Sequence, residues 1–149
     1  MASGDNEAVT DGFALAPIAD LSCADIPATA DRLLPLRRRL TEWAMATGLS
    51  GDQVDALILA CDEAMSNVVS HAYPHSAGTF DLLATHRPDQ GAVHVTIRDR
   101  GQWQPESPNP GPLHGRGLVL IRALAHRVTF EQATDGTTVH MTWLLPAPD

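Results

Sequence analysis

The period of the hydrophobic pattern changes part-way along the chain, and this change restricts the fold more than any other feature. Before Pro74, apolar residues recur at helical spacing in two segments, 28–47 and Ser50 to Tyr73. From residue 79 they alternate with polar residues, which is typical of strands with one buried face. This order predicts an α+β fold, a two-layer sandwich with helices packed on one face of a mixed, mainly antiparallel sheet. The predicted strands are 18–26, 79–86, 92–99, 126–133 and 137–145, and a third helix is predicted at 117–125.

Several helix boundaries have local signals. Gly48 ends the first helix, and Pro35 favours a start near that residue because proline disrupts a helix interior. Ser50 and Gln53 have the spacing of a capping box, in which each side chain bonds the backbone of the other residue. The second helix is therefore predicted to begin directly after Ser50.

One domain accounts for the folded part of the chain. The 149 residues suffice for a single hydrophobic core, and no repeat or linker divides them. The first residues, MASGDNEAVTDG, are polar and acidic. We therefore expect a disordered tail over 1–15 and a single domain over 16–147.

Composition excludes several classes of function. The formal net charge is −8 and lysine is absent, which argues against a nucleic-acid surface and against a Walker A phosphate loop. The polar, acidic first residues do not have the pattern of a secretory signal, and no apolar run approaches the roughly 18–20 residues that cross a bilayer. We expect a cytoplasmic protein without a membrane or direct nucleic-acid partner. Cys23 and Cys61 are too few to indicate a disulfide framework or a zinc site. The run Arg37-Arg38-Arg39 is either a solvated helix face or a contact for an acidic protein.

A polar stripe interrupts the second helix. The stretch CDEAMSNVVSHAY places Glu63, Asn67 and His71 four residues apart, so they share one side of the helix. One interpretation is an exposed, hydrogen-bonded stripe. The other is a ligand site, favoured because the small residues Ala60, Ala64 and Ser70 nearby leave room for a molecule to approach.

A carboxylate continues the inward-facing side of the strand at 92–99. In VTIRDRG, Asp99 has the same parity as Val95 and Ile97, which places it on the core side. A carboxylate there is costly unless donors reach it, and the amino group of a purine would serve. Gly101 would let that ring approach the backbone. Alternatively, the strand ends one residue earlier and Asp99 caps a turn.

Two glycines open the third helix, in HGRGLVLI. Free N–H groups at a helix start favour an anion, so Gly115 and Gly117 indicate a phosphate site, with Arg100 or Arg116 as candidate charges. A Rossmann site fits poorly, because Leu120 stands where its third glycine would be.

Together these segments resemble the GHKL ATPases, and within that superfamily the bacterial anti-sigma-factor serine/threonine protein kinases. EAMSNVVSHAY resembles the N box of this family, DRG its first glycine box, GRGLVLI its second, and DGTTV its closing strand. The match runs from about 28 to 145 and implies the Bergerat ATP-binding fold. It also implies ATP and Mg²⁺ as cofactors.

The resemblance assigns roles to matching residues. Glu63 would be the general base that takes the proton from a serine hydroxyl, and Asn67 would coordinate Mg²⁺. Asp99 would bind the adenine amino group, with Gly101 and Thr137 nearby. His71 is expected to be structural. The phosphates would lie on Gly115, Arg116, Gly117 and Leu118, beneath a lid over 102–114.

The implied function is that of an ATP-binding anti-sigma regulatory factor with serine-protein-kinase activity towards a STAS-type anti-sigma-factor antagonist. Its partners would be a sigma factor and that antagonist, and family members often form homodimers. Trp103 stands where the first glycine box usually has a second glycine, and the lid carries four prolines. These departures favour an alternative, a nucleotide-binding partner-switching module without significant kinase activity. A two-component histidine kinase is disfavoured, because the helix at 28–47 contains no histidine.

Overall fold

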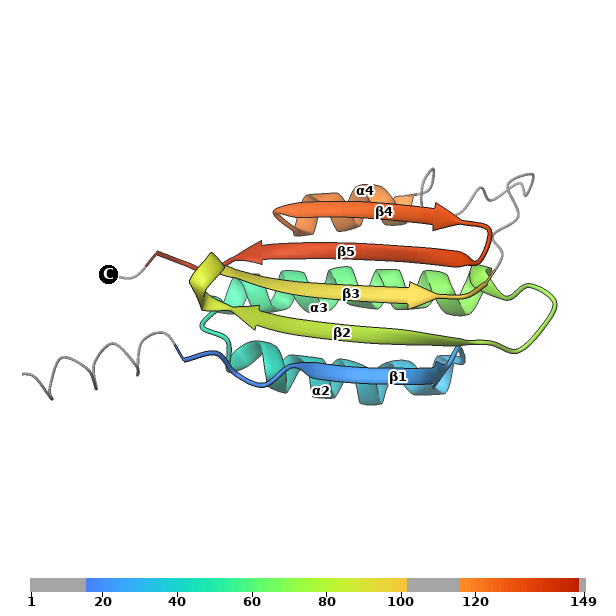
Figure 1. Ribbon diagram of the computed structural model, residues 1–149, viewed down its shortest axis with the longest axis horizontal. Helices are drawn as coiled ribbons and strands as arrows, with labels where there is room; N and C mark the ends of the chain where they lie inside the picture. Colours follow the sequence, from blue (N-terminus) through green and yellow to red (C-terminus); the bar gives the residue numbers. More distant parts are fainter. Residues whose placement is uncertain (1–15, 102–115, 148–149) are drawn as a thin grey trace, which may run out of the picture.

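Three α-helices cover one face of a five-stranded sheet in the computed structural model, which describes residues 16–101 and 116–147 (Figure 1). Along the sheet the strand order is β1-β2-β3-β5-β4, and all four pairings between these strands are antiparallel. The strands are β1 (Leu21–Pro27), β2 (Thr79–Arg87), β3 (Ala92–Asp99), β4 (Arg127–Ala133) and β5 (Gly136–Leu144). The α-helices are α2 (Leu33–Met45), α3 (Gly51–Asn67) and α4 (Arg116–Leu124).

The predicted α+β sandwich is confirmed, and its described strands contain no parallel pair although a mixed sheet was expected. The predictions for the tail 1–15, the lid 102–114, Trp103 and Gly115 lie outside the described residues. None of the helices in the described part is long and apolar enough to span a membrane.

Alternation along the central strands builds the core. On β3 the residues Val93, Val95 and Ile97 face the helices, and on β5 the buried residues include Met141 and Trp143. The Trp143 indole nitrogen donates a 2.8 Å hydrogen bond to the Leu124 carbonyl, which fastens the end of α4 to the sheet. The period-two pattern therefore places one apolar face of the sheet beneath the helical layer.

The first helix starts later than its full hydrophobic segment. A 3₁₀ turn at Ala30–Arg32 precedes α2, so Pro35 lies in the first turn of α2, where the missing N–H leaves no intrahelical bond unmade. Within the arginine run, Arg37 Nε pairs with Asp62 Oδ2 of α3 at 2.7 Å, and Arg39 donates to Cys23 Sγ at 3.2 Å. Two of the three arginines are thus engaged inside the domain.

The helix α3 begins and ends in different ways. The capping box predicted at Ser50 and Gln53 is present, and both of its hydrogen bonds form. After Asn67 the chain does not leave the helical path but widens into a five-residue π-helix, Val68–Ala72, and then reaches Tyr73. Short π-helical turns are frequent at functional sites. The segment predicted to end at Tyr73 is therefore helical to Ala72, with its last turn altered directly beyond Asn67.

Candidate nucleotide site

Three predicted site residues meet where α3 passes the start of α4. Glu63 and Asn67 lie one turn apart on α3, and both are half-buried. A Cβ atom added to Gly117 would lie 2.6 Å from Glu63 Oε1 and 2.8 Å from Asn67 Nδ2. Both atoms are at the ends of side chains, which would have to shift to admit a larger residue. The first turn of α4 is therefore in direct contact with the polar stripe of α3.

Asp99 is the last residue of β3 and is 2% exposed. Its Oδ1 accepts hydrogen bonds from the backbone N–H groups of Gly101 at 3.0 Å and Thr137 at 3.3 Å. These donors offset part of the cost of burying the carboxylate. The inward-facing interpretation of Asp99 is confirmed, and the alternative in which the strand ends one residue earlier is wrong.

Two further glycines hold the backbone around Asp99. A Cβ atom on Gly101 would lie 2.0 Å from the carbonyl oxygen of Ala72, and one on Gly136 would lie 2.0 Å from that of Asp99. Gly136 also has a φ of +146°, which side chains rarely adopt. Gly101 was expected to admit a purine ring. In the structure the group that comes closest to it is the end of the π-helix.

A small pocket lies between Asn67 of α3 and the Asp99–Thr137 pair of the sheet. Apolar side chains form most of its wall, and its free space of about 20 Å³ suffices for one water molecule. A larger ligand would displace lining side chains or extend out of the pocket. The lining residues are Ala64, Asn67, Val68, Ile97, Asp99, Ile121, Phe130, Thr137 and Val139.

Two buried polar atoms at this pocket are unsatisfied. Within the described ranges, 16–101 and 116–147, Asn67 Nδ2 and Thr137 Oγ1 have no hydrogen-bond partner. A buried polar group normally has one, and leaving it unpaired costs about 1–3 kcal/mol. An apolar pocket with a few convergent polar groups is typical of a small-molecule site.

Residues 26–143 match the family described as the histidine kinase-like ATPase domain. The chain belongs to this family. The resemblance to the GHKL ATPases is therefore confirmed over a range that includes Glu63, Asn67, Asp99 and Thr137. A domain of this family implies nucleotide binding.

Solved structures agree with this assignment. The chain is similar to the RsbU and RsbW domains of Rv1364c from Mycobacterium tuberculosis, with 27% identity and a TM-score of 0.71 over 89% of this chain and 34% of that chain. Two structures of the Erythrobacter litoralis EL346 blue-light activated histidine kinase have 22% and 18% identity, with TM-scores of 0.55 and 0.56. They cover 65% and 77% of this chain, and 32% and 60% of those chains. These two show the shared fold alone. The chain spans about a third of the first two of these structures.

In the described part of the chain, no group of three or more His, Cys, Asp or Glu side chains is placed to bind a metal ion. The amide of Asn67 still suits Mg²⁺, which usually takes one or two protein oxygens and completes its shell with phosphate and water. Asn67 lines the pocket, and its amide nitrogen has no hydrogen-bond partner among the described residues. The residues therefore fit a nucleotide whose metal is shared with its phosphates.

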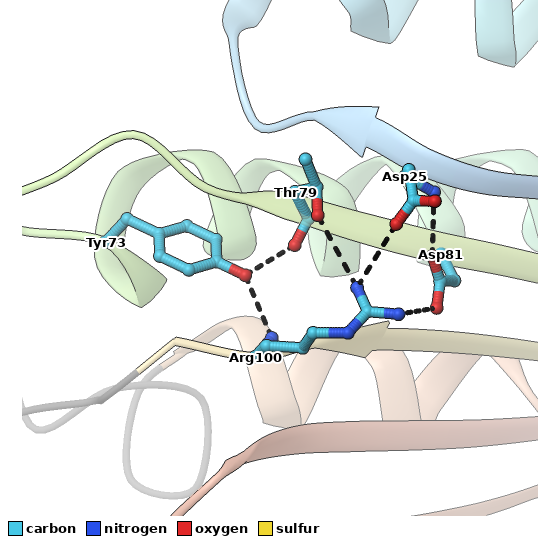
Figure 2. A network of polar contacts seen from close by, with 5 residues as sticks. All are labelled: Asp25, Tyr73, Thr79, Asp81 and Arg100. Atoms are coloured by element: carbon cyan, nitrogen blue, oxygen red, sulfur yellow. Dashed lines mark hydrogen bonds and ion pairs between the residues drawn. The ribbon is translucent and has the colours of Figure 1, made fainter.

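Arg100, predicted as a candidate charge for a phosphate, has acidic partners within the domain. Its Nη2 pairs with Asp81 Oδ2 at 2.6 Å and its Nη1 lies 3.9 Å from Asp25 Oδ1 (Figure 2). The hydrogen bond to Asp81 is the main reason that the pKa of Arg100 is raised. The guanidinium is thus engaged with β1 and β2. Of the remaining predicted residues, Leu118 is half-buried in the first turn of α4, and the side chain of Arg116 lies outside the described part.

Sequence reasoning missed Tyr73 as a site-related residue. Its hydroxyl bonds both the Thr79 carbonyl and the Arg100 N–H, directly beyond Asp99. The only local signal is that this single tyrosine of the chain stands before Pro74, at the predicted end of a helix. That signal predicts a boundary and gives no indication of its contacts.

Proposed function

We propose that this chain is an ATP-binding anti-sigma regulatory factor that phosphorylates a serine of a STAS-domain anti-sigma-factor antagonist. The observation that carries the proposal is the contact of Glu63 and Asn67 with Gly117, beside a pocket that reaches Asp99 and Thr137. The RsbW domain named in the Mycobacterium tuberculosis structure supports the same class of function. A sigma factor is the second proposed partner, and a homodimer is the proposed assembly.

The base of ATP is proposed to bind on the Asp99 side. The adenine amino group would donate to the buried carboxylate, whose Oδ1 already accepts two backbone N–H groups. Thr137 Oγ1, which lacks a partner among the described residues, would gain one from the nucleotide. Such pairing would remove a cost that the unliganded site carries.

The phosphates are proposed to bind on the Glu63 side. Backbone N–H groups at the start of α4, from Gly115, Gly117 and Leu118, would donate to them. Asn67 would hold Mg²⁺, which when bound neutralises phosphate charge. In transfer, the serine oxygen bonds the γ-phosphorus while the bond to ADP breaks. The Glu63 carboxylate takes the hydroxyl proton.

Transfer of labelled phosphate from ATP to purified STAS-domain proteins of the same organism tests the reaction. Glu63→Gln should lower the transfer rate at least about 100-fold, because it removes the proton acceptor. Its Mg-ATP affinity should stay within about threefold of wild type. Glu42→Gln, at an exposed position of α2, is the matched control and should transfer normally. Full transfer by Glu63→Gln would contradict the proposed base.

The alternative, a nucleotide-binding partner-switching module without significant kinase activity, is favoured by Trp103 in the first glycine box. It predicts Mg-ATP binding, nucleotide-dependent binding of a sigma factor, and no transfer to any STAS-domain protein. Wild-type transfer that Glu63→Gln abolishes would exclude it.

A further inference from the structure

Tyr73 connects the two sides of the nucleotide site through one hydroxyl. The hydroxyl donates to the Thr79 carbonyl oxygen and accepts a 2.9 Å hydrogen bond from the Arg100 N–H (Figure 2). Tyr73 directly follows the π-helix that extends α3, and Arg100 directly follows β3. The contact therefore joins the segment that carries Glu63 and Asn67 to the residue next to Asp99.

The Arg100 side chain also contacts β2, the strand whose first carbonyl accepts the Tyr73 hydroxyl. Its guanidinium bonds Asp81 at 2.6 Å and approaches Thr79 Oγ1 at 3.5 Å. Asp81 Oδ1 in turn accepts the Asp25 N–H at 2.8 Å. Asp25 has a φ of 54°, where the register of β1 against β2 shifts. Asp81 thus ties Arg100 to the irregular part of the edge strand.

Arg100 lies within the backbone segment that holds the Asp99 carboxylate. Arg100 stands between Asp99 and Gly101, and the Gly101 N–H, like that of Thr137, donates to Asp99 Oδ1. Gly101 itself is pressed against the Ala72 carbonyl, so this turn has little room to relax. A shift of the Arg100 backbone would move the carboxylate and one of its donors together.

We infer that Tyr73 and Arg100 are positioning residues that fix the Asp99 carboxylate for the amino group of adenine and so set the preference for adenine among purine bases. The inference rests on the proposed function, which assigns Asp99 to that amino group. It concerns residues outside the lining of the pocket that Asn67, Asp99 and Thr137 share. Their effect is on base selection rather than on phosphate transfer.

Calorimetric binding of Mg-ATP and Mg-ITP to the full chain tests the inference. Hypoxanthine has an oxygen where adenine has its amino group, so the ITP base lacks the donor that is proposed to bond Asp99. Tyr73→Phe removes the hydroxyl and keeps the ring that packs on Gly78. We expect ATP affinity to fall about five- to tenfold and ITP affinity less than twofold. The ratio of the two affinities should fall at least about threefold.

Arg100 provides a second, independent set of variants. Arg100→Ala should lower the ATP/ITP ratio about threefold, and Arg100→Lys should restore part of it because an ammonium can still pair with Asp81. Arg38→Ala is the matched control. Arg38 is exposed on α2, is in none of these contacts, and its removal should leave the ratio unchanged.

The outcomes separate this inference from the function on which it rests. An unchanged ratio in both Tyr73→Phe and Arg100→Ala, with or without a lower melting temperature, would overturn the positioning role and leave the assignment of Asp99 intact. A wild-type protein without any preference for ATP over ITP would overturn both. Should Tyr73→Phe not fold, the Arg100 variants decide alone.

Discussion

The two ends of α3 are built on opposite principles. At its start, the Ser50 and Gln53 side chains bond each other's backbone, and Gln53 Nε2 also donates to the Leu144 carbonyl at 2.7 Å. At its end, Asn67 leaves a buried amide nitrogen without a partner among residues 16–101 and 116–147. The helix then widens into the π-helix Val68–Ala72. One end satisfies its polar groups, and the other keeps some of them available.

This difference indicates that the start of α3 contributes to stability and that its end is suited to ligand binding. An unpaired buried polar group costs about 1–3 kcal/mol, and a ligand that pairs with it recovers that cost on binding. The two ends are separated by about 25 Å along the helix axis. Substitutions at that distance should act independently, so each end can be tested alone.

Asn67→Ala should have the largest effect on the ligand-binding end. Mg-ATP affinity should fall about 100-fold, or ~2.7 kcal/mol, because the proposed metal ligand is lost. The free energy of unfolding should stay the same or rise by up to about 1 kcal/mol, because an unsatisfied buried group is removed. Calorimetry and urea unfolding measure the two quantities. Asp55→Ala, at an exposed site of the same helix, should leave Mg-ATP affinity unchanged.

The opposite result for Asn67→Ala would contradict the contrast between the two ends of α3. Strong destabilisation with a modest loss of affinity would mean that Asn67 is a structural residue, and the end of α3 would then resemble its start.

Features that depend on near neighbours in sequence could be predicted. The capping box follows from Ser50 and Gln53 three residues apart, and the inward position of Asp99 follows from its parity with Ile97. Both depend on the period of one element and on nothing distant. The resemblance to a known family then grouped Glu63, Asn67 and Asp99 at one site, and the structure brings Asn67 and Asp99 to one pocket.

Features that depend on register between distant segments could not be predicted. The contacts of Arg100 join β1, β2 and the residue after β3, and a one-residue slip between strands would point those side chains to the other face. The same holds for Gly101, whose closest neighbour is the Ala72 carbonyl from a segment nearly thirty residues earlier. The π-helix after Asn67 also has no local signature, because its residues are ordinary for an α-helix.

Gly117→Ala should also lower Mg-ATP affinity with little change in stability, and the loss of affinity should be smaller than in Asn67→Ala. The added methyl group would lie 2.6 Å from Glu63 Oε1, so Glu63 and Asn67 would have to shift. Mg-ATP affinity should fall about tenfold, or ~1.4 kcal/mol. Stability should change by less than about 1 kcal/mol, because the higher helix propensity of alanine is offset by the shift of Glu63 and Asn67.

Gly51→Ala is the matched control for Gly117→Ala. Gly51 is the first residue of α3, and an added Cβ there meets nothing within 4 Å. Its Mg-ATP affinity should equal that of wild type. Equal affinity in Gly117→Ala as well would contradict the close contact between α4 and the Glu63–Asn67 pair.

Ser50→Ala should have the smallest effect, and it should lower stability without changing Mg-ATP affinity. Loss of the cap leaves the Gln53 N–H without its side-chain acceptor, which should lower the free energy of unfolding by about 1 kcal/mol. Mg-ATP affinity should not change, because the site lies at the other end of the helix. Ser50→Asp keeps a cap acceptor and should retain wild-type stability in urea unfolding. If Ser50→Ala lowered stability and affinity together, the two ends of α3 would be coupled, and the division between a stabilising end and a ligand-binding end would not hold.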